Sequence, residues 1–357
     1  MKKRIASLLM VTAVMMGMAG CTAAEDAGGA AASPSPSTSS SAPAAQATGD
    51  KVMLTFSGGN SSTESYTYWV AVNKAVKSLY PNLDINTVDA TGGFDVAQRV
   101  RAGSIDAGNG VSVTDYDSYS GTGKFEGQGA ADNLRVMWYY TESPINFCVD
   151  KELGLTKVDE LTGVKMHPGG TGSTNTLVAM DVCNLLGIEP NWFEASSSDG
   201  IDAVMNRQIS GAARNGSAPD SQIVQMQSAV DLSFLTFTDE ELEKITEAMP
   251  YLNVVTIPAG SYEGQDYDYK TIATAQGGIT TTALTQEQGY EYISAMMSDE
   301  GRSQWTAAYP KGGEVDVIDL TLRTAKAPLH AGTVQYLEEQ GIEVPSELIP
   351  PEYVPVK

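Results

Sequence analysis

The sequence predicts an α/β fold with parallel sheets, on three observations. From Lys51 onward, short β-like runs alternate with longer amphipathic runs, which is the pattern of strands joined by helices. Three loops rich in Gly, Ser and Thr each follow a predicted strand and open a predicted helix. The last third of the chain changes to a mainly helical pattern. Residues 51–357 are enough for two ordinary domains, so we expect two lobes and a C-terminal helical annex.

The hydrophobic periodicity locates the individual elements in order. Thr238 before three acidic residues is a helix N-cap signal, and Pro250 lies beyond the end of that helix. We expect strands at Val52–Phe56, Leu83–Val88, Ile105–Val111, Leu134–Tyr140, Asn146–Val149, Val164–Met166, Trp192–Ala195, Ser210–Arg214, Leu232–Phe237, Thr271–Ala275 and Gly278–Thr281. We expect helices at Tyr66–Tyr80, Phe94–Ala102, Asn175–Leu186, Gly200–Arg207, Ser221–Ser228, Asp239–Ala248, Gln286 to about Ala308, and Pro328–Glu339.

The first fifty residues have the composition of a secretory leader and a tether. Lys2-Lys3-Arg4 precedes an uncharged, mostly apolar stretch over 5–18, and small residues lead to Cys21, as at a bacterial lipobox. We expect a lipoprotein signal peptide over 1–20, lipid on Cys21, and a flexible tether over 21–50. Ordinary signal cleavage near Ala19, with Cys21 uninvolved, is the alternative. The folded part then divides into lobe 1 (51–145), lobe 2 (146–253) and a return to lobe 1 with the terminal helices (254–357).

The charge and the cysteine count exclude several classes of protein. A formal net charge of −22 disfavours nucleic acid and anionic membrane surfaces, because phosphate groups need clustered Lys and Arg. Cys148 and Cys183 lie in apolar runs, where buried free thiols are expected rather than a disulfide. His167 and His330 lack the spacing of a metal pair, so no metal or cofactor is expected.

The loop SGGNSSTESY (57–66) raises the question of a phosphate site, and its residues argue against one. A P-loop lysine is missing, and Glu64 has the wrong charge. What remains is a donor-rich turn at a helix N-terminus. Comparable loops are Ala90-Thr91-Gly92-Gly93-Phe94 and residues 169–176. Each loop alone fits a tight strand-to-helix turn, but all three lie at the carboxyl ends of strands and can converge on one interlobe cleft. The ligand residues predicted from these loops are Ser57, Gly58, Gly59, Asn60, Ser61, Thr63, Glu64, Thr91, Gly92, Gly93, Gly172, Ser173, Thr174 and Asn175.

Catalytic signatures are weak, and we do not expect an enzyme. The chain has no Gly-x-Ser-x-Gly elbow and no Cys and His close in sequence. Glu263, Asp266 and Asp268 lack the spacing of a calcium loop, so solvated loop acids are the better interpretation. Asp115 and Asp117 are interpreted in the same way.

Several motifs resemble one family of transport receptors. They are Ser57–Ser65, Thr91-Gly92-Gly93-Phe94 with Gly103-Ser104-Ile105-Asp106, Gly172–Asn175, residues 208–212 with Gly216–Pro219, Pro328–Gly332 with Tyr336 and, as the most distinctive, Thr256–Asp266. In this order they resemble the TAXI-type solute receptors of TRAP (tripartite ATP-independent periplasmic) transporters. The resemblance covers Val52 to Glu339. It implies a two-lobed periplasmic-binding-protein-like fold (type II) with an interlobe ligand cleft, and hinge crossings near Ser143–Asn146 and Asn253–Ile257.

The resemblance also implies a function. Such a receptor captures a small carboxylate outside the cytoplasm and delivers it to TRAP membrane subunits; we expect a monomer held at the outer face of the cytoplasmic membrane. Arg214, with Asn215 beside it, could hold a substrate carboxylate, or could form a surface salt bridge instead. Glu64-Ser65 stands where the family has an aromatic pair, and Glu64 would repel a dicarboxylate or pair with a cationic group, so an amino-acid-like zwitterion is at least as plausible as a dicarboxylate. A signalling receptor, or a surface antigen that has lost its ligand, would have the same fold.

Overall fold

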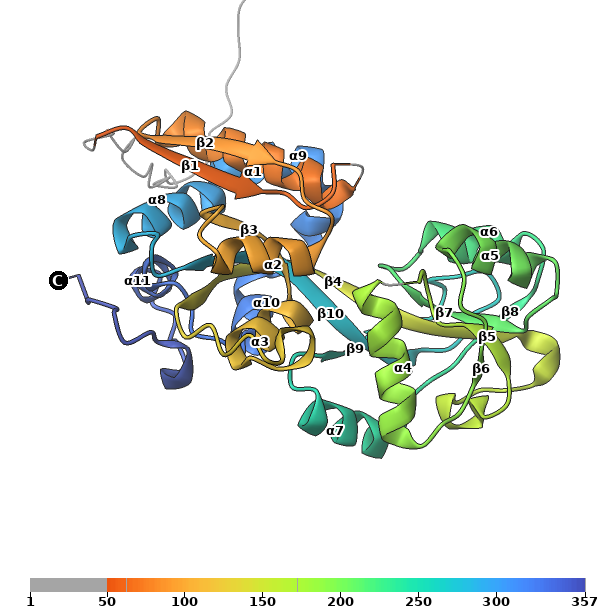
Figure 1. The fold of residues 1–357 in the computed structure, drawn as a ribbon. Coiled ribbons are helices and arrows are strands. Elements are labelled where there is room, and N and C mark those ends of the chain that lie inside the picture. Colours follow the sequence, from red (N-terminus) through yellow and green to blue (C-terminus); the bar gives the residue numbers. More distant parts are fainter. Residues whose placement is uncertain (1–49, 62, 172, 357) are drawn as a thin grey trace, which may run out of the picture. The chain divides into compact units, whose positions relative to one another are not determined.

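Two β-sheets that share one long strand organise the structure. The computed structural model describes residues 50–61, 63–171 and 173–356, all of which fall within one compact unit. The predicted secretory leader, Cys21 and the tether lie outside the described residues. Sheet A has the order β2-β1-β3-β10-β4, and sheet B the order β4-β7-β5-β6, so that β4 belongs to both (Figure 1).

Sheet A contains the first three strands in parallel and two long antiparallel strands. They are β1 (Val52–Ser57), β2 (Leu83–Val88), β3 (Ala107–Val111), β4 (Leu134–Asp150) and β10 (Tyr269–Thr281), with β9 (Asn253–Ile257) paired to β10. One core packs β1 and β2 against α1 (Glu64–Leu79), α8 (Gln286–Met297) and α9 (Asp299–Ala308). A second core contains α2 (Gly93–Arg101), α10 (Val317–Thr324) and α11 (Ala331–Glu339), while α3 (Ser112–Ser120) follows β3 directly.

Sheet B is smaller and has helices on both faces. Its strands are β5 (Lys165–His167), β6 (Asn191–Trp192), β7 (Gly211–Asn215) and β8 (Leu232–Phe234), besides the second half of β4. One face packs against α4 (Thr174–Leu186) and α7 (Asp239–Ala248). The other packs against α5 (Ser197–Met205) and α6 (Ser221–Gln227). Along β4, Ile145, Phe147 and Val149 enter one core and Cys148 the other, which is the alternation of a two-faced strand.

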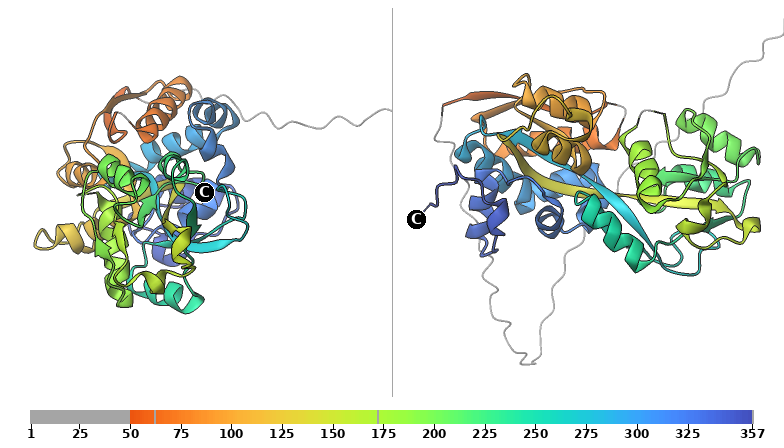
Figure 2. Two further views of the ribbon diagram at one scale, coloured as in Figure 1. Left: turned by 90° about the vertical axis from the view of Figure 1, so that its right-hand side faces the viewer. Right: turned by 60° about the horizontal axis from the view of Figure 1, so that its bottom comes forward.

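The main difference from the predicted elements is that two pairs of predicted strands are single strands. The prediction left residues 141–145 of β4 and residues 276–277 of β10 outside any strand, but both strands continue through these residues (Figure 2). Pro144 does not interrupt β4, whose pairing passes from β10 to β7 at this position. The α/β class is confirmed, but the sheets are mixed rather than parallel, because β4 and β10 pair antiparallel with their neighbours.

The helix predictions needed three corrections. The predicted helix 286–308 is two helices, because Ser298 has extended backbone and caps α9 through Gly301 N–H. The predicted helix at Pro328 begins only at Ala331, since Leu329 forms a β-bridge with Val136. Helices α3 and α10 and strand β9 were not predicted. The predicted N-cap at Thr238 is confirmed, with Glu241 completing a capping box.

The two cysteines that the structure describes are buried and free. Burial raises the pKa of Cys148 and of Cys183 to about 12, so neither is a reactive thiolate at neutral pH. None of the described helices is both long and apolar enough to cross a membrane.

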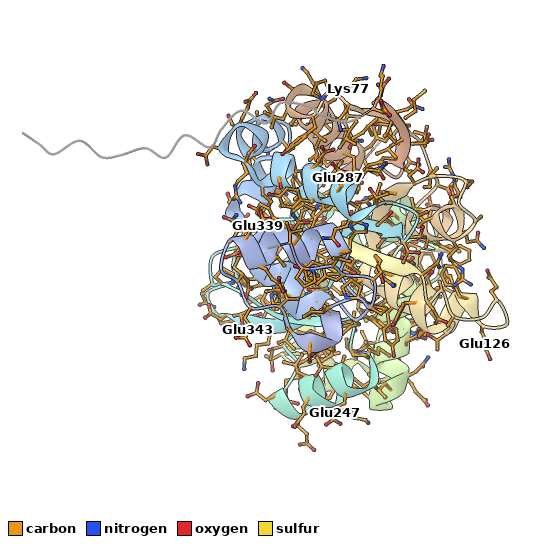
Figure 3. All side chains as sticks on the ribbon, turned by 90° about the vertical axis from the view of Figure 1, so that its left-hand side faces the viewer. Lys77, Glu126, Glu247, Glu287, Glu339 and Glu343 are labelled. Atoms are coloured by element: carbon orange, nitrogen blue, oxygen red, sulfur yellow. The ribbon has the colours of Figure 1, made fainter. Side chains whose placement is uncertain are left out.

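The C-terminal segment is held to β4 by a bidentate ion pair. Arg135 is almost fully buried, and its Nε and Nη2 donate to the two carboxylate oxygens of Glu352 at 2.6 and 2.8 Å. The hydrogen bond from Arg135 holds the pKa of Glu352 below its usual value. Three other glutamates of the C-terminal part of the chain are exposed and are labelled in Figure 3: Glu287, Glu339 and Glu343.

Replacing Glu352→Gln is expected to lower the free energy of unfolding by about 1–2 kcal/mol at neutral pH, because Arg135 loses its charged partner. A carboxyl whose pKa is lowered by folding contributes stability above its unfolded pKa and loses it as pH falls through the folded one. The difference between the two proteins should therefore shrink below about pH 4. Urea unfolding across pH measures it. Glu343→Gln, an exposed change in the same C-terminal part of the chain, is the control; equal effects of both changes would contradict the role given to the ion pair.

Candidate functional site

A cavity of about 600 Å³ is lined by residues of both sheets and of the loops at their strand ends. Sheet A and its helices supply Gly59, Asn60, Thr63, Glu64, Ser65, Thr91, Gly92, Gly93, Asn109, Val111, Tyr140, Thr141, Ser143, Gln276, Tyr309 and Lys311. The end of β7 and the turn after it supply Arg214, Gly216, Ser217, Pro219, Asp220 and Ser221. The volume lies within the range of about 300–1,000 Å³ usual for small-molecule sites.

The first predicted loop divides between residues that line the cavity and residues that shape the turn. Ser57 is fully buried, and its Oγ accepts from the Gly59 N–H at 3.3 Å. At Gly58 a Cβ would lie 2.9 Å from the Tyr66 ring, so the turn needs glycine there. Ser61 is exposed and donates its N–H to Asp89 at 2.5 Å. Gly59, like Asn60, Thr63 and Glu64, lines the cavity.

The second predicted loop opens a helix terminus toward the cavity. The N–H and the hydroxyl of Thr91 both donate to the Asp95 carboxylate, which fixes Thr91 against the first turn of α2. Gly92 is the N-cap of α2 and has no side chain to cap the first turn. A Cβ on Gly93 would lie 2.7 Å from Val111, so this loop packs directly on β3. All three loop residues line the cavity.

The third predicted loop lines a second, smaller cavity of about 200 Å³. Ser173 caps α4 through Thr176 N–H and lines this cavity together with Asn215 and Arg214. Arg214 is thus the residue common to both cavities. Thr174 begins α4 and lines neither of these two cavities. Gly172 and the side chain of Asn175 lie outside the described part of the structure.

The guanidinium of Arg214 has a loose acidic partner. Its Nε lies 3.4 Å from Asp220 Oδ1, and its Nη2 donates to Oδ2 at 3.5 Å. Although the Nε is within ion-pair distance, it is buried and has no hydrogen bond of good geometry among the described residues. Asp220 is better held, since Oδ1 also accepts from the N–H groups of Gln222 and Ile223 at the start of α6. The arginine can therefore change partners more easily than the aspartate can.

The most distinctive motif of the sequence supports the cavity from behind. The turn at 258–266 is closed by the buried Gln265, whose amide donates to Pro258 O at 3.1 Å. The Tyr262 hydroxyl in the same turn accepts from the Asp220 N–H at 3.1 Å. This motif thus positions Asp220 without lining the cavity. Glu263, Asp266 and Asp268 are exposed.

Sequence reasoning missed the lining residues on β3, β4 and β10, which we call the cavity floor, and those that follow α9. Asn109 is the central residue of a Gly-Asn-Gly run on β3, and Gln276 lies in the middle of β10, where no pattern marks a site. Tyr309 and Lys311 follow α9, far along the chain from the other lining residues. With Lys311, the cavity has two cationic side chains, Arg214 and Lys311, and two acidic ones, Glu64 and Asp220. No described group of three or more His, Cys, Asp or Glu side chains could hold a metal ion.

The interpretation of Asp115 as a solvated loop acid is wrong. Asp115 lies in the first turn of α3 and is 1% exposed. Its two oxygens accept from the Val111 N–H at 3.1 Å and the Tyr139 hydroxyl at 2.9 Å. Burial raises its pKa to about 8, although these hydrogen bonds act in the opposite direction. Asp115 therefore holds the cavity residue Val111 from inside the fold.

Comparison with known proteins identifies the family of most of the described chain. The sequence profile of one protein family, described as the NMT1-like family, matches residues 56–341. The chain belongs to the NMT1-like family. Among solved structures, this NMT1-like chain is similar to a TctC solute-binding protein from Polaromonas, at 14% identity and a TM-score of 0.51, covering 75% of this chain and 90% of that one.

Two further solved structures are more distant. The periplasmic aliphatic sulphonate-binding protein SsuA from Escherichia coli matches at 13% identity over 85% of this chain and 94% of that one, with a TM-score of 0.45. MatC from Rhodopseudomonas palustris, solved with bound malate, matches at 12% identity over 72% and 88%, with a TM-score of 0.42. The similarity to the Polaromonas structure shows that the NMT1-like chain has the predicted two-lobed fold of a solute-binding protein.

Replacing Asp115→Asn should flatten the pH dependence of stability. A carboxyl whose folded pKa is raised stabilises the fold fully below its unfolded pKa, and this stability is lost as pH rises through the folded value. Between about pH 6 and about pH 8 the wild type should lose about 2 kcal/mol more unfolding free energy than the variant, whose amide mimics the protonated acid. Urea unfolding measures both. The exposed change Asp132→Asn should keep the wild-type profile; parallel profiles for wild type and Asp115→Asn would contradict the assignment.

Proposed function

We propose that this protein is an extracytoplasmic solute receptor of the TAXI type, which binds a small amino-acid-like carboxylate and delivers it to TRAP membrane subunits. The observation that carries the proposal is the cavity lined from both sheets, whose lining includes the cationic Arg214 and Lys311 and the acidic Glu64 and Asp220. The similarity to a protein described as a TctC solute-binding protein supports the receptor class. The motifs around 57–65, 91–106 and 256–266 support the TAXI subfamily. A binding role without catalysis fits a cavity of this kind.

The charges of the cavity favour a ligand that carries an ammonium group over a dicarboxylate without one. Arg214 has only a loose partner in Asp220, so a ligand carboxylate can replace that partner with bidentate hydrogen bonds. Glu64 begins α1 at the cavity wall. It would repel a second carboxylate at close range, but it would stabilise an ammonium group. L-glutamate or L-aspartate can place a carboxylate at Arg214 and its ammonium group at Glu64. Succinate has no ammonium group and can pair only with the cationic side chains.

Closure of two lobes on the ligand follows from the arrangement of these groups. Glu64 and Lys311 belong to the elements of sheet A, and Arg214 belongs to sheet B. A ligand shifts the open and closed populations only by the difference in its affinity for the two states. A solute that contacts both charged groups gains that difference on closure. The long strands β4 and β10, which pass from one sheet toward the other, are the segments where the hinge would bend.

Binding is tested with L-glutamate, L-aspartate and succinate in thermal shift and calorimetry. At a concentration of 100 times Kd, a ligand should add about 2.7 kcal/mol to the free energy of unfolding. Arg214→Ala should weaken an acid ligand by about 30-fold or more, since two charge-assisted hydrogen bonds are lost. Glu64→Gln should weaken the two amino acids but leave succinate unchanged or improved.

The matched control for this test is Arg207→Ala. Arg207 pairs with Asp150 at the edge of sheet B, outside the cavity, so its removal changes the net charge equally without touching the ligand. Binding of none of the three acids to the wild type would contradict the proposed ligand class. An equal loss of affinity in both arginine variants would remove Arg214 from the site and leave only a general charge effect.

Attachment to the membrane is proposed to be through lipid on Cys21, supported by Lys2-Lys3-Arg4, the apolar stretch 5–18 and the small residues before the cysteine. The full chain produced in a bacterium with a lipoprotein pathway should lack residues 1–20 and carry a diacylglycerol on Cys21. Intact-mass spectrometry measures this. Cys21→Ser should release the protein from membranes. An unmodified cysteine, with cleavage near Ala19, would contradict the lipid anchor.

A further inference from the structure

The cavity floor contains one amide side chain whose orientation is fixed by the chemistry of its neighbours. Asn109 lies on β3, is 5% exposed and lines the cavity. Its Oδ1 accepts from the Trp69 Nε1–H at 2.9 Å and from the Tyr140 hydroxyl at 3.0 Å. An indole N–H can only donate, so the amide atom facing Trp69 must be the oxygen.

The second donor at this oxygen is equally fixed. The Tyr140 ring stacks on Tyr68, with ring centroids 3.7 Å apart, and is buried. Burial and the neighbouring tyrosines raise the pKa of Tyr140 well above its usual value, so its hydroxyl stays protonated. The Tyr68 hydroxyl is itself held as an acceptor by the Trp138 Nε1–H at 3.0 Å. The aromatic core of sheet A therefore presents two hydrogen-bond donors to Asn109 Oδ1. A flipped amide would place its NH2 group against both donors, so the orientation of the amide is fixed.

With the oxygen held, the amide nitrogen remains the donor at the floor. The Asn109 Nδ2 donates to Gln276 Oε1 at 3.4 Å, which is long for an N–H···O hydrogen bond. The Gln276 amide in turn donates to Ser143 Oγ, also at 3.4 Å. Gln276 and Ser143 both line the cavity. An amide nitrogen carries two hydrogens, so this floor has a fixed donor whose only described protein partner is a weak one.

We propose that Asn109 is a specificity-determining residue. Its Nδ2 donates a hydrogen bond to an oxygen atom of the ligand at the cavity floor and excludes an ammonium group from that position. The inference rests on the proposed function and deepens it. A carboxylate or carbonyl oxygen at the floor completes the hydrogen bonds of the Asn109 amide. An ammonium there would face another donor, so in a zwitterionic ligand it must point toward an acidic side chain of the wall.

The test replaces the donor by an acceptor of the same shape. In Asn109→Asp the Trp69 and Tyr140 donors keep their partner oxygen, and the second oxygen of the new carboxyl faces the ligand. Calorimetry with L-glutamate, L-aspartate and succinate should show a loss of affinity of about 30- to 100-fold for each acid that binds the wild type. Lowering the pH from about 7.5 to about 5.5 should recover part of this loss, because a buried carboxyl has a raised pKa and offers an O–H donor when protonated.

A matched control separates this effect from the cost of burying a charge. Asn73 lies in the same core, is 3% exposed, accepts from the Tyr292 hydroxyl at 2.6 Å and does not line the cavity. Asn73→Asp should lower stability in a similar way and leave affinity within about twofold. If Asn109→Asp fails to fold, Tyr140→Phe is the second variant. It removes one of the two donors that orient the amide and should weaken the same acids by about 3- to 10-fold.

The outcomes separate two failures. If the wild type binds none of the three acids, the proposed function is contradicted, and the inference falls with it. If the wild type binds and Asn109→Asp binds as tightly at neutral pH, only the inference about Asn109 is overturned. Loss of affinity without recovery at the lower pH would also overturn it, because the role of a donor would then be unsupported.

Discussion

The antiparallel pairing of β4 with β10 is the interaction on which the rest of the structure depends. These strands pair along most of β10, and β4 then continues into sheet B through β7. The register shifts beside Gly277, and this position needs glycine because a Cβ would lie 1.9 Å from the Trp138 carbonyl oxygen. The two strands also carry Tyr140, Thr141, Ser143 and Gln276 into the cavity floor. The site is therefore built onto the element that joins the two sheets, and a motion of one sheet relative to the other must pass through it.

The charge of the cavity differs from the charge of the whole chain in a way that bears on ligand choice. The chain has a formal net charge of −22, and its outer glutamates repel anions at long range. Within the cavity, two cations balance two acids. An anionic solute thus gains little from steering and must gain its affinity from short-range contacts with Arg214, Lys311 and the floor. This favours ligands that match hydrogen bonds over ligands that merely carry charge.

The sequence predicted the order of the elements because hydrophobic periodicity is a local property. It failed where pairing partners decide the outcome. The prediction ended one strand at Tyr140 and began the next at Asn146, but the pairing of β4 with β10 and then with β7 keeps the strand extended between them. The break at Ser298 was present in the sequence, since a serine followed by Asp299 and Glu300 is an N-cap signal that the long helical prediction overlooked. Asp115 could not be recognised as buried, because its burial depends on Tyr139 from a strand that follows it in sequence.

The candidate site shows the same division between local and distant information. Glycine-rich loops are visible in the sequence, and two of the three predicted loops line the main cavity. The role of Asn109 could not be predicted from the sequence, because the orientation of its amide depends on Trp69 and Tyr140, which lie on α1 and β4. An exposed loop residue such as Glu64 can change its side chain at little cost to stability. The amide of Asn109 cannot change in this way, since its two donors belong to the aromatic core. We therefore expect the loops to set which solute is bound, and the core to set which end of the solute lies at the floor.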